Sequence, residues 1–419
     1  MNALIARLYP ICRSITGDGV RETLRILREY IPLEIREVAT GTKVLDWTVP
    51  REWNIRDAWI KDSTGKRLVD FCKLNLHVVS YSSPIHRSMR LAELKDHLFT
   101  VPGYPDWVPY RTSYYDENWG FCLSEKQLAQ LSDDEEYEVC IDSSLANGQL
   151  TYGEYLLKGD QAEEMLISCH VCHPSLANDN LSGIVLAVEI ARRLAVSPCR
   201  YSYRFLFVPG SIGAITWLAR NEEILARIRD GLVLTCVGDA ANITYKRSRR
   251  GDADIDRAFA HVLRHSGDQH RVIDFYPYGY DERQYCSPGF NLPVGCLMRS
   301  RHGTFPEYHT SADNLEFVRS ASLIDSLEKC LAVIDVIEQD RVYLNNNPKG
   351  EPQLGKRGLY KGLSTGPGQR ADEMALLWVL NLSDSNHSLL DIAERANLPF
   401  ESIKAAANAL AAADLLTLR

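Results

Sequence analysis

The hydrophobic positions of residues 150–342 follow two alternating periods, which together predict an α/β fold. Four short apolar runs are typical of buried strands: residues 164–167, 201–208, 231–237 and 293–298. Four longer segments are apolar at helical spacing: residues 184–194, 212–225, 254–265 and 320–339. Alternating apolar strands and helices predict a mainly parallel sheet with helices on both faces.

Three other segments have different patterns. Residues 1–38 carry two short apolar helical faces. Residues 39–149 are rich in Trp, Tyr, Thr, Val and Pro, and a hairpin-like turn at 62–66 favours a small β-rich domain. A linker rich in Gly, Pro and Asn, residues 345–369, precedes three helical stretches, so residues 346–419 resemble a winged-helix domain.

Charge and cysteine content narrow the class of protein. The 419 residues carry a net charge of −8, which gives no electrostatic case for binding nucleic acid or an anionic membrane. No apolar run has the length of a membrane span, and the N-terminus lacks the apolar region of a signal peptide. Eleven scattered cysteines do not suggest a disulfide framework. We therefore expect a reduced, cytoplasmic protein.

The C-terminal segment is acidic in spite of its winged-helix pattern. From Ala371 onward it has seven acids against three bases, and its third helical stretch is rich in alanine. Such a helix offers little to DNA phosphates. We expect a packing or dimerisation module that supports homo-oligomers rather than a DNA reader.

Candidate chemistry gathers at predicted strand ends. His170, His173 and Asp179 lie between the apolar run at 164–167 and the helix that follows. Asp239 follows the predicted strand at 231–237, and His309 follows the predicted strand at 293–298. Ligands bind at the carboxyl ends of strands in α/β sheets, and nitrogen and oxygen donors there suit zinc or a similar divalent ion.

Four motifs carry a resemblance to a known family: Arg13-Ser14-Ile15-Thr16-Gly17, Cys172-His173-Pro174-Ser175 with Asn178-Asp179-Asn180, residues 245–252, and Tyr308-His309-Thr310. Their order resembles that of two-zinc aminopeptidases with a phosphorylase/hydrolase-like α/β fold. More closely, it resembles bacterial aminopeptidase-like proteins, often associated with surface-polysaccharide or secondary-metabolite biosynthesis, that carry an inserted β-domain and a C-terminal winged helix. The resemblance implies that residues 1–38 and 150–345 form one domain with 39–149 inserted.

The resemblance also implies a ligand set for one or two Zn²⁺ ions. One site takes His173, or alternatively His170, with Asp179 and Asp239; the other shares Asp179 and adds His309. Aminopeptidases carry a Glu-Glu pair after the second strand, as general base and ligand, where this chain has Pro209-Gly210-Ser211. The nearest substitutes are Asp281 and Glu282, which would act as catalytic carboxylates unless they form a solvated turn.

The predicted function is zinc-dependent hydrolysis of an amide bond in a peptide or small molecule, with aminopeptidase as the leading subclass. An amidase or deacylase acting on a biosynthetic intermediate is the alternative enzyme. A degenerate fold that binds a ligand or partner without turnover is the alternative outside the enzymes. A basic set could hold a substrate carboxylate or could simply be solvated: Arg247, Arg249, Arg250 and Arg301.

Overall fold

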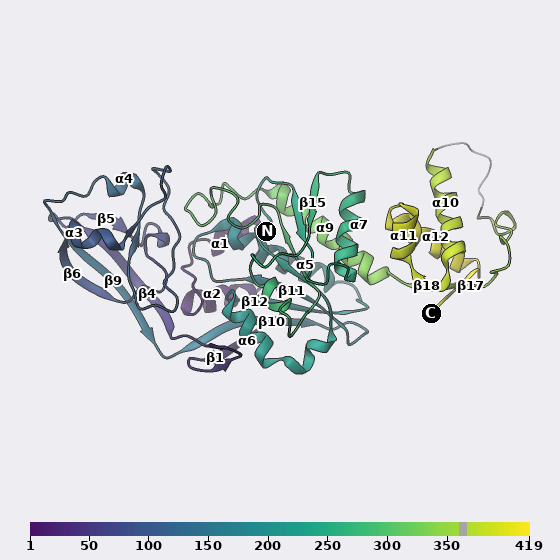
Figure 1. Ribbon diagram of the computed structural model, residues 1–419, viewed down its shortest axis with the longest axis horizontal. Coiled ribbons are helices and arrows are strands. Elements are labelled where there is room, and N and C mark those ends of the chain that lie inside the picture. Colours follow the sequence, from purple (N-terminus) through teal and green to yellow (C-terminus); the bar gives the residue numbers. More distant parts are fainter. Residues whose placement is uncertain (360–366) are drawn as a thin grey trace. The chain divides into compact units, whose positions relative to one another are not determined.

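The computed structural model describes residues 1–359 and 367–419 (Figure 1). The described chain divides into two compact units, which we treat separately. The first contains Met1–Gly251 and Arg271–Leu327, and the second contains Asp252–His270 and Glu328–Arg419. No helix among the described residues is long and apolar enough to span a membrane.

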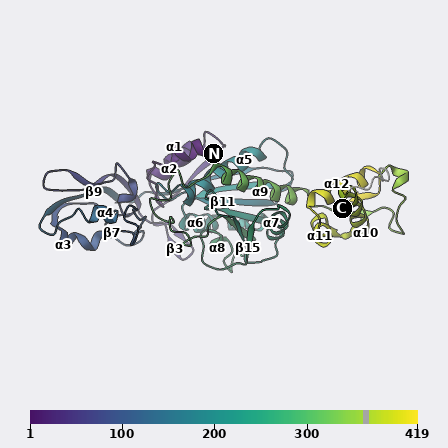
Figure 2. The same cartoon turned by 90° about the horizontal axis from the view of Figure 1, so that it is seen from above.

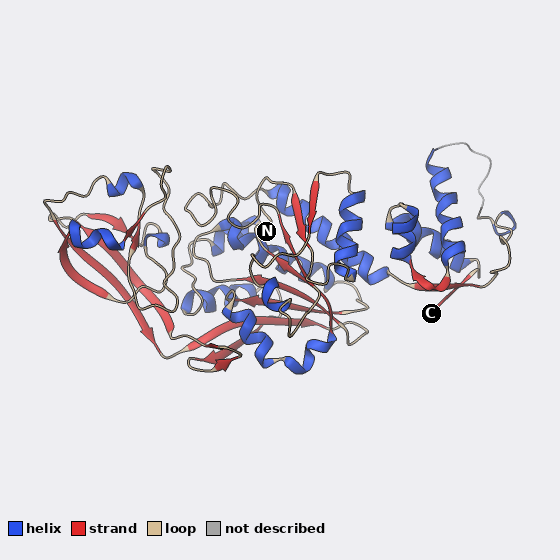
Figure 3. Cartoon of the chain, in the orientation of Figure 1, coloured by secondary structure: helices blue, strands red, loops and turns tan. Residues whose placement is uncertain are grey.

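An eight-stranded sheet in the order β1-β10-β12-β11-β13-β16-β14-β15 organises the first unit (Figure 3). The central strands β12, β11, β13 and β16 are parallel, whereas β1, β10 and β14 pair antiparallel. The strands are β1 (Glu34–Ala39), β10 (Gln149–Leu157), β11 (Glu164–His170), β12 (Ser202–Val208), β13 (Ile228–Leu234), β14 (Ile243–Lys246), β15 (His270–Ile273) and β16 (Val294–Met298). The predicted α/β fold is confirmed.

The four predicted strands are the four parallel ones, and the physical reason is burial on both faces. Every residue of β11, β12 and β16 is buried, so these strands read as continuous apolar runs. Figure 2 shows helices on both sides of the sheet, with α1 (Asn2–Leu8), α2 (Asp18–Leu27) and α5 (Gly183–Leu194) on one side. Helices α6 (Ile212–Arg220) and α8 (Glu282–Tyr285) lie on the other side.

The β-rich segment forms a four-stranded antiparallel sheet in the order β5-β4-β9-β6. Its strands are β4 (Glu52–Lys61), β5 (Arg67–Asp70), β6 (Ile85–Arg90) and β9 (Glu136–Ala146). Shorter elements accompany them: β2 (Lys43–Val44), β3 (Trp47–Thr48), η1 (Asn75–His77), α3 (Leu91–Leu94), η2 (Lys95–His97), β7 (Leu98–Phe99), β8 (Phe121–Cys122) and α4 (Glu125–Leu128). The flanking strands β1 and β10 pair with each other, Ala39 opposite Gln149. The exact domain boundaries stay predictions.

The C-terminal part of the second unit has three helices and a small antiparallel sheet, β18-β17-β19. The elements are β17 (Val342–Asn345), α10 (Pro367–Leu382), β18 (Asp384–Ser388), α11 (Leu389–Ala396), α12 (Phe400–Ala412) and β19 (Leu416–Leu418). The unit also contains α7 (Asp254–His265), and α9 (Ser320–Gln339) ends within it. Three short helical segments remain along the described chain: η3 (Ala177–Ser182), η4 (Glu222–Arg227) and η5 (Gly355–Arg357). Residues 360–366 of the predicted linker lie outside the described residues.

Candidate metal centre

The carboxyl end of β11 and the turn that follows it supply most of a buried cluster. His170 is the last residue of β11, and His173 follows in the connecting loop. Asp179 lies in the turn Ala177–Ser182, just before α5. His309 comes from the long loop after β16 and has a left-handed backbone with φ 56°. The strand-end placement expected from the sequence therefore holds for these four residues.

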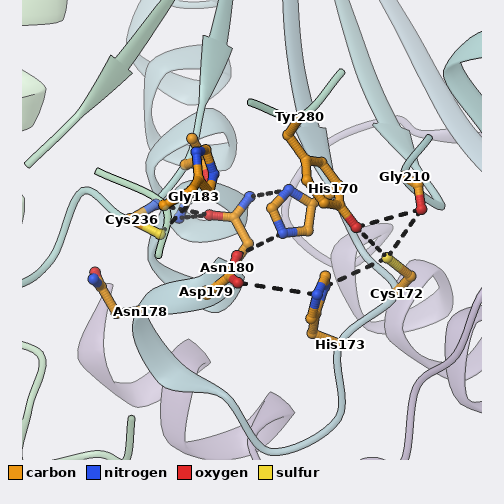
Figure 4. A network of polar contacts seen from close by, with 12 residues as sticks. His170, Cys172, His173, Asn178, Asp179, Asn180, Gly183, Gly210, Cys236 and Tyr280 are labelled. Carbon is orange, nitrogen blue, oxygen red and sulfur yellow. Dashed lines mark hydrogen bonds and ion pairs between the residues drawn. The ribbon is translucent and has the colours of Figure 1, made fainter. Parts of the chain in front are cut away.

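Asp179 is the centre of the cluster (Figure 4). Its Oδ1 lies 2.8 Å from His170 Nε2, and its Oδ2 lies 3.0 Å from His309 Nε2. His173 Nε2 lies 3.9 Å from the same Oδ2. One ligand atom from each of His170, His173 and Asp179 falls within 4.8 Å of the others. The two oxygens of one carboxylate thus face different histidines.

Burial and charge fix the protonation of this cluster. Asp179 is fully buried, and burial alone would raise its pKa, but His173 and His170 outweigh it and hold the pKa well below the usual range. Burial lowers the pKa of His173 well below its usual value, with His170 and His309 adding to the effect against the pull of Asp179. Burial therefore favours the neutral form of the His173 imidazole, and the surrounding histidines favour the anionic form of Asp179.

A second layer of buried groups positions these side chains. Asp313 accepts from the backbone N–H of Asn178 at 2.6 Å and of Asp179 at 2.9 Å. Arg13, only 1% exposed, donates from Nε to the carbonyl of His173 at 2.8 Å. The backbone N–H of Tyr110 donates to the carbonyl of His309 at 2.7 Å. Of these three, only Arg13 belongs to a motif that the sequence singled out.

The hydrogen bonds of Asp239 join it to residues outside the cluster. Its Oδ2 accepts from Asn178 Nδ2 at 2.8 Å and from the Ser300 N–H at 3.2 Å. Its Oδ1 accepts from Ser300 Oγ at 3.0 Å and from the Ala241 N–H at 2.8 Å. Both oxygens are occupied by donors. These contacts place Asp239 next to Asn178, and the ligand role that the resemblance implied stays a prediction.

Tyr280 packs against Gly210, which lies in the segment where the resemblance to aminopeptidases implied that a Glu-Glu pair is missing. A Cβ on Gly210 would lie 1.9 Å from Cε1 of the Tyr280 ring. The phenol donates to the Gly210 carbonyl at 3.3 Å, and its ring lies over His170 with 3.9 Å between centroids (Figure 4). Burial raises the pKa of Tyr280 well above its usual value, so the phenol is protonated.

The two predicted substitute carboxylates are directed elsewhere. Glu282 is fully buried and forms an ion pair with Lys246 at 2.5 Å, and its Oε2 accepts from the Tyr280 N–H at 3.0 Å. Asp281 is also fully buried, and neither of its oxygens has a hydrogen-bond partner among the described residues. Burial raises the pKa of Asp281 well above its usual value. The prediction of a solvated Asp-Glu turn is wrong because both side chains are buried. Neither carboxylate forms a hydrogen bond or an ion pair with Asp179.

A pocket of about 540 Å³ opens above the cluster. His173 and His309 line it, together with Tyr280 and the Gly210-Ser211 backbone. Other lining residues are Ile15, Trp47, Tyr110, Arg111, Thr112, Tyr114, Tyr115, Ile212, Ile215, Arg283 and Gln284. The aromatic residues of the 110–115 loop, which sequence analysis assigned to the β-rich segment, thus belong to the wall of the site.

The arginines predicted to hold substrate do not line this pocket. Arg249 donates to Asn291 Oδ1 at 2.8 Å, and Arg250 donates to the Asn291 carbonyl at 3.0 Å. Arg247 donates to the Gly251 carbonyl at 2.6 Å. Arg301 lines a different pocket. The sequence missed the two arginines that do line it, Arg111 and Arg283.

The nitrogen and oxygen donors of the cluster are of the kinds that bind a zinc ion. Three imidazoles and one carboxylate are the nitrogen and oxygen ligands that zinc takes. His170, His173 and Asp179 are buried, and His309 is partly exposed. The neutral state of His173 leaves its lone pair available for a metal. His170, His173, Asp179 and His309 are the residues that would hold it.

Solved structures share this fold. A crystal structure of a Clostridium acetobutylicum protein, provisionally described as a peptidase, is 54% identical, with a TM-score of 0.95 over 100% of this chain and 96% of that one. A zinc aminopeptidase from Bacillus subtilis has a TM-score of 0.58 at 12% identity, over 80% of this chain and 93% of that one. A peptidase M28 precursor from Shewanella amazonensis has a TM-score of 0.55 at 12% identity, over 80% and 92%. The two distant neighbours show the aminopeptidase-like fold.

Sequence comparisons identify the family. A Clostridium acetobutylicum protein, provisionally named a polysaccharide biosynthesis protein with an aminopeptidase-like domain, is 56% identical over 99% of this chain and 95% of its own length. A winged helix-turn-helix family matches residues 341–418, which confirms the predicted C-terminal fold. A domain family of unknown function, DUF4910, matches residues 2–340. The chain therefore belongs to the DUF4910 family and carries an aminopeptidase-like fold followed by a winged helix.

Proposed function

We propose that the chain is a zinc-dependent hydrolase of an amide bond. One observation carries this: the carboxylate of Asp179 presents its two oxygens to different histidines, directly below a pocket that His173 and His309 line. Such a carboxylate can serve one ion or bridge two. When bound, the ion would act as a Lewis acid on the amide carbonyl and lower the pKa of water.

The residues around the cluster have separate roles in this proposal. Tyr280 lines the pocket, and its protonated phenol donates to the Gly210 carbonyl, which holds the ring against His170. Arg13 and Asp313 hold the backbone of His173 and Asp179, which fixes the cluster before substrate arrives. The apolar wall of Ile212 and Ile215 excludes water from one side.

Two other functions have an observation in their favour. The name of the C. acetobutylicum relative favours an amidase or deacylase that acts on a biosynthetic intermediate over a digestive aminopeptidase. Binding without turnover is favoured by the pocket wall, because no Asp or Glu among the described residues lines it to accept a proton from water. Both alternatives use the same pocket.

Hydrolysis assays on zinc-loaded protein test the proposal. The panel contains aminoacyl anilides and N-acylated amides, measured with and without a chelator. We expect chelator-sensitive turnover of at least one amide, its loss in His309→Ala, and its retention in His86→Ala, which changes an exposed histidine of β6. Stoichiometric zinc with no turnover across the panel would favour the binding protein instead.

A further inference from the structure

The pocket above the cluster has a cationic wall. Its lining includes two arginines, Arg111 and Arg283, and no aspartate or glutamate among the described residues. Both arginines are exposed, and neither forms an ion pair with a described residue. Arg111 contacts a ring instead, with its guanidinium carbon 4.9 Å from the centre of Phe99. Each guanidinium therefore has donors available for an anion.

A buried arginine beneath the pocket, Arg13, carries a further positive charge. Arg13 is fully buried, its Nε and Nη1 donate to backbone carbonyls, and its Nη2 has no hydrogen-bond partner among the described residues. Burial lowers the pKa of Arg13 to about 10, which still leaves it charged at neutral pH. Asp179, the anion of the cluster, interacts with His170 and His309. The described lining of the pocket itself thus carries two cations and no carboxylate before any metal is added.

Aromatic side chains form the outer part of the pocket. Trp47 and Tyr115 are 45% and 54% exposed, and their ring centroids lie 5.4 Å apart. Tyr114 lies deeper, where its hydroxyl and that of Tyr110 are 2.7 Å apart. Exposed rings next to a cavity suit an apolar or ring-shaped part of a ligand, while the arginines suit its charged end.

The free amino terminus of a peptide is poorly matched to these surroundings. An ammonium has three donors and no acceptor, so it needs carboxylates or several carbonyls, and two cations would repel it. A carboxylate matches the planar fork of an arginine and accepts two parallel hydrogen bonds from it. We propose, on the basis of the function above, that the pocket takes an amide that carries a carboxylate, rather than a peptide with a free amino terminus.

Titration calorimetry with three phenylalanine derivatives that carry different charges tests this. N-acetylphenylalanine is an anion, N-acetylphenylalaninamide is neutral and phenylalaninamide is a cation. We expect the zinc-loaded protein to bind the anion at least tenfold more tightly than the neutral probe and the cation most weakly. Arg111→Gln and Arg283→Gln should each weaken anion binding about tenfold, because each removes a charged hydrogen bond.

A matched control separates the arginines from the metal, which can also attract a carboxylate. Arg301→Gln removes an arginine from a different pocket and should leave all three affinities unchanged. In the double variant Arg111→Gln/Arg283→Gln, the preference for the anion over the neutral probe should disappear. Equal anion affinity in the double variant and the unchanged protein would overturn the proposal.

A failure of the anionic-substrate proposal can be distinguished from a failure of the proposed hydrolase function. Turnover of phenylalaninamide with no preference for the anion would keep the hydrolase and overturn the anionic substrate. Tight, arginine-dependent binding of the anion with no turnover of any amide would keep the anionic ligand and overturn the hydrolase.

Discussion

The ring of Tyr280 occupies the space that a side chain at Gly210 would need. A Cβ at position 210 would lie 1.9 Å from the ring, and the phenol also donates to the Gly210 carbonyl. A side chain at position 210 and the Tyr280 ring in this orientation therefore exclude each other. The same ring also lies against His170, with 3.9 Å between ring centroids.

We expect Gly210→Ala to lower the free energy of unfolding by about 1–3 kcal/mol, because the methyl group overlaps the Tyr280 ring. In the background of Tyr280→Ala the same change should cost much less, since the ring is gone. Denaturant unfolding of the four proteins measures this coupling as a double-mutant cycle. Gly289→Ala is the control, because nothing lies within 4 Å of a Cβ there. Additive effects at 210 and 280 would show that the two residues do not contact each other.

Replacing Glu282 tests whether this residue stabilises the fold or takes part in catalysis. Burial alone would lower the pKa of Lys246, but the Glu282 carboxylate outweighs it and raises that pKa. Because the pair is fully buried, we expect Glu282→Gln to lower the free energy of unfolding by about 3–5 kcal/mol, as unpaired buried charges do. Denaturant unfolding and turnover are measured on the same samples.

The double variant Lys246→Met/Glu282→Leu is the control for this pair. It removes both charges and should recover most of the stability. If Glu282→Gln abolished turnover without loss of stability, Glu282 would be the general base that the sequence suggested, and its ion pair with Lys246 would not be its main role.

The C-terminal winged helix should not bind duplex DNA. Its third helix, α12, carries one cation, Lys404, whose Nζ lies 2.7 Å from Asp335 and also pairs with Glu401. With seven acids against three bases from Ala371 onward, few charges remain for phosphates. We expect no mobility shift of random duplex DNA by the full chain at about 50 mM salt. A shift that disappears as salt is raised would contradict this.

Much of the fold could be predicted because its strands are buried on both faces. The continuous apolar runs around Leu166, Phe205 and Val233 allow no other placement than the centre of a covered sheet. Strand β14 and the edge strand β15 were not predicted, because each has only four residues and no apolar run distinguishes them. Propensity is a weak signal for such short segments.

The site could be predicted only in part, because sequence shows ligand types but not where side chains point. His170, His173, Asp179 and His309 lie at strand ends, and a general rule about α/β sheets places them together. Asp239 also follows a strand, yet its oxygens accept from Asn178 and Ser300. Arg111 and Tyr115 come from a loop far away in the sequence, and only tertiary structure brings them to His309.

Zinc content is the most direct test of the central claim, which is a metal centre built on Asp179. Elemental analysis compares the unchanged protein with Asp179→Ala, His170→Ala and His309→Ala, and with His86→Ala as a control on an exposed histidine. We expect one or two zinc ions per chain in the unchanged protein and the control. Asp179→Ala should lose all of it, because both oxygens face ligating histidines, and each histidine variant should lose at least part. Unchanged zinc content in Asp179→Ala would contradict the account. So would an unchanged protein that retains no zinc after incubation with zinc and removal of the excess.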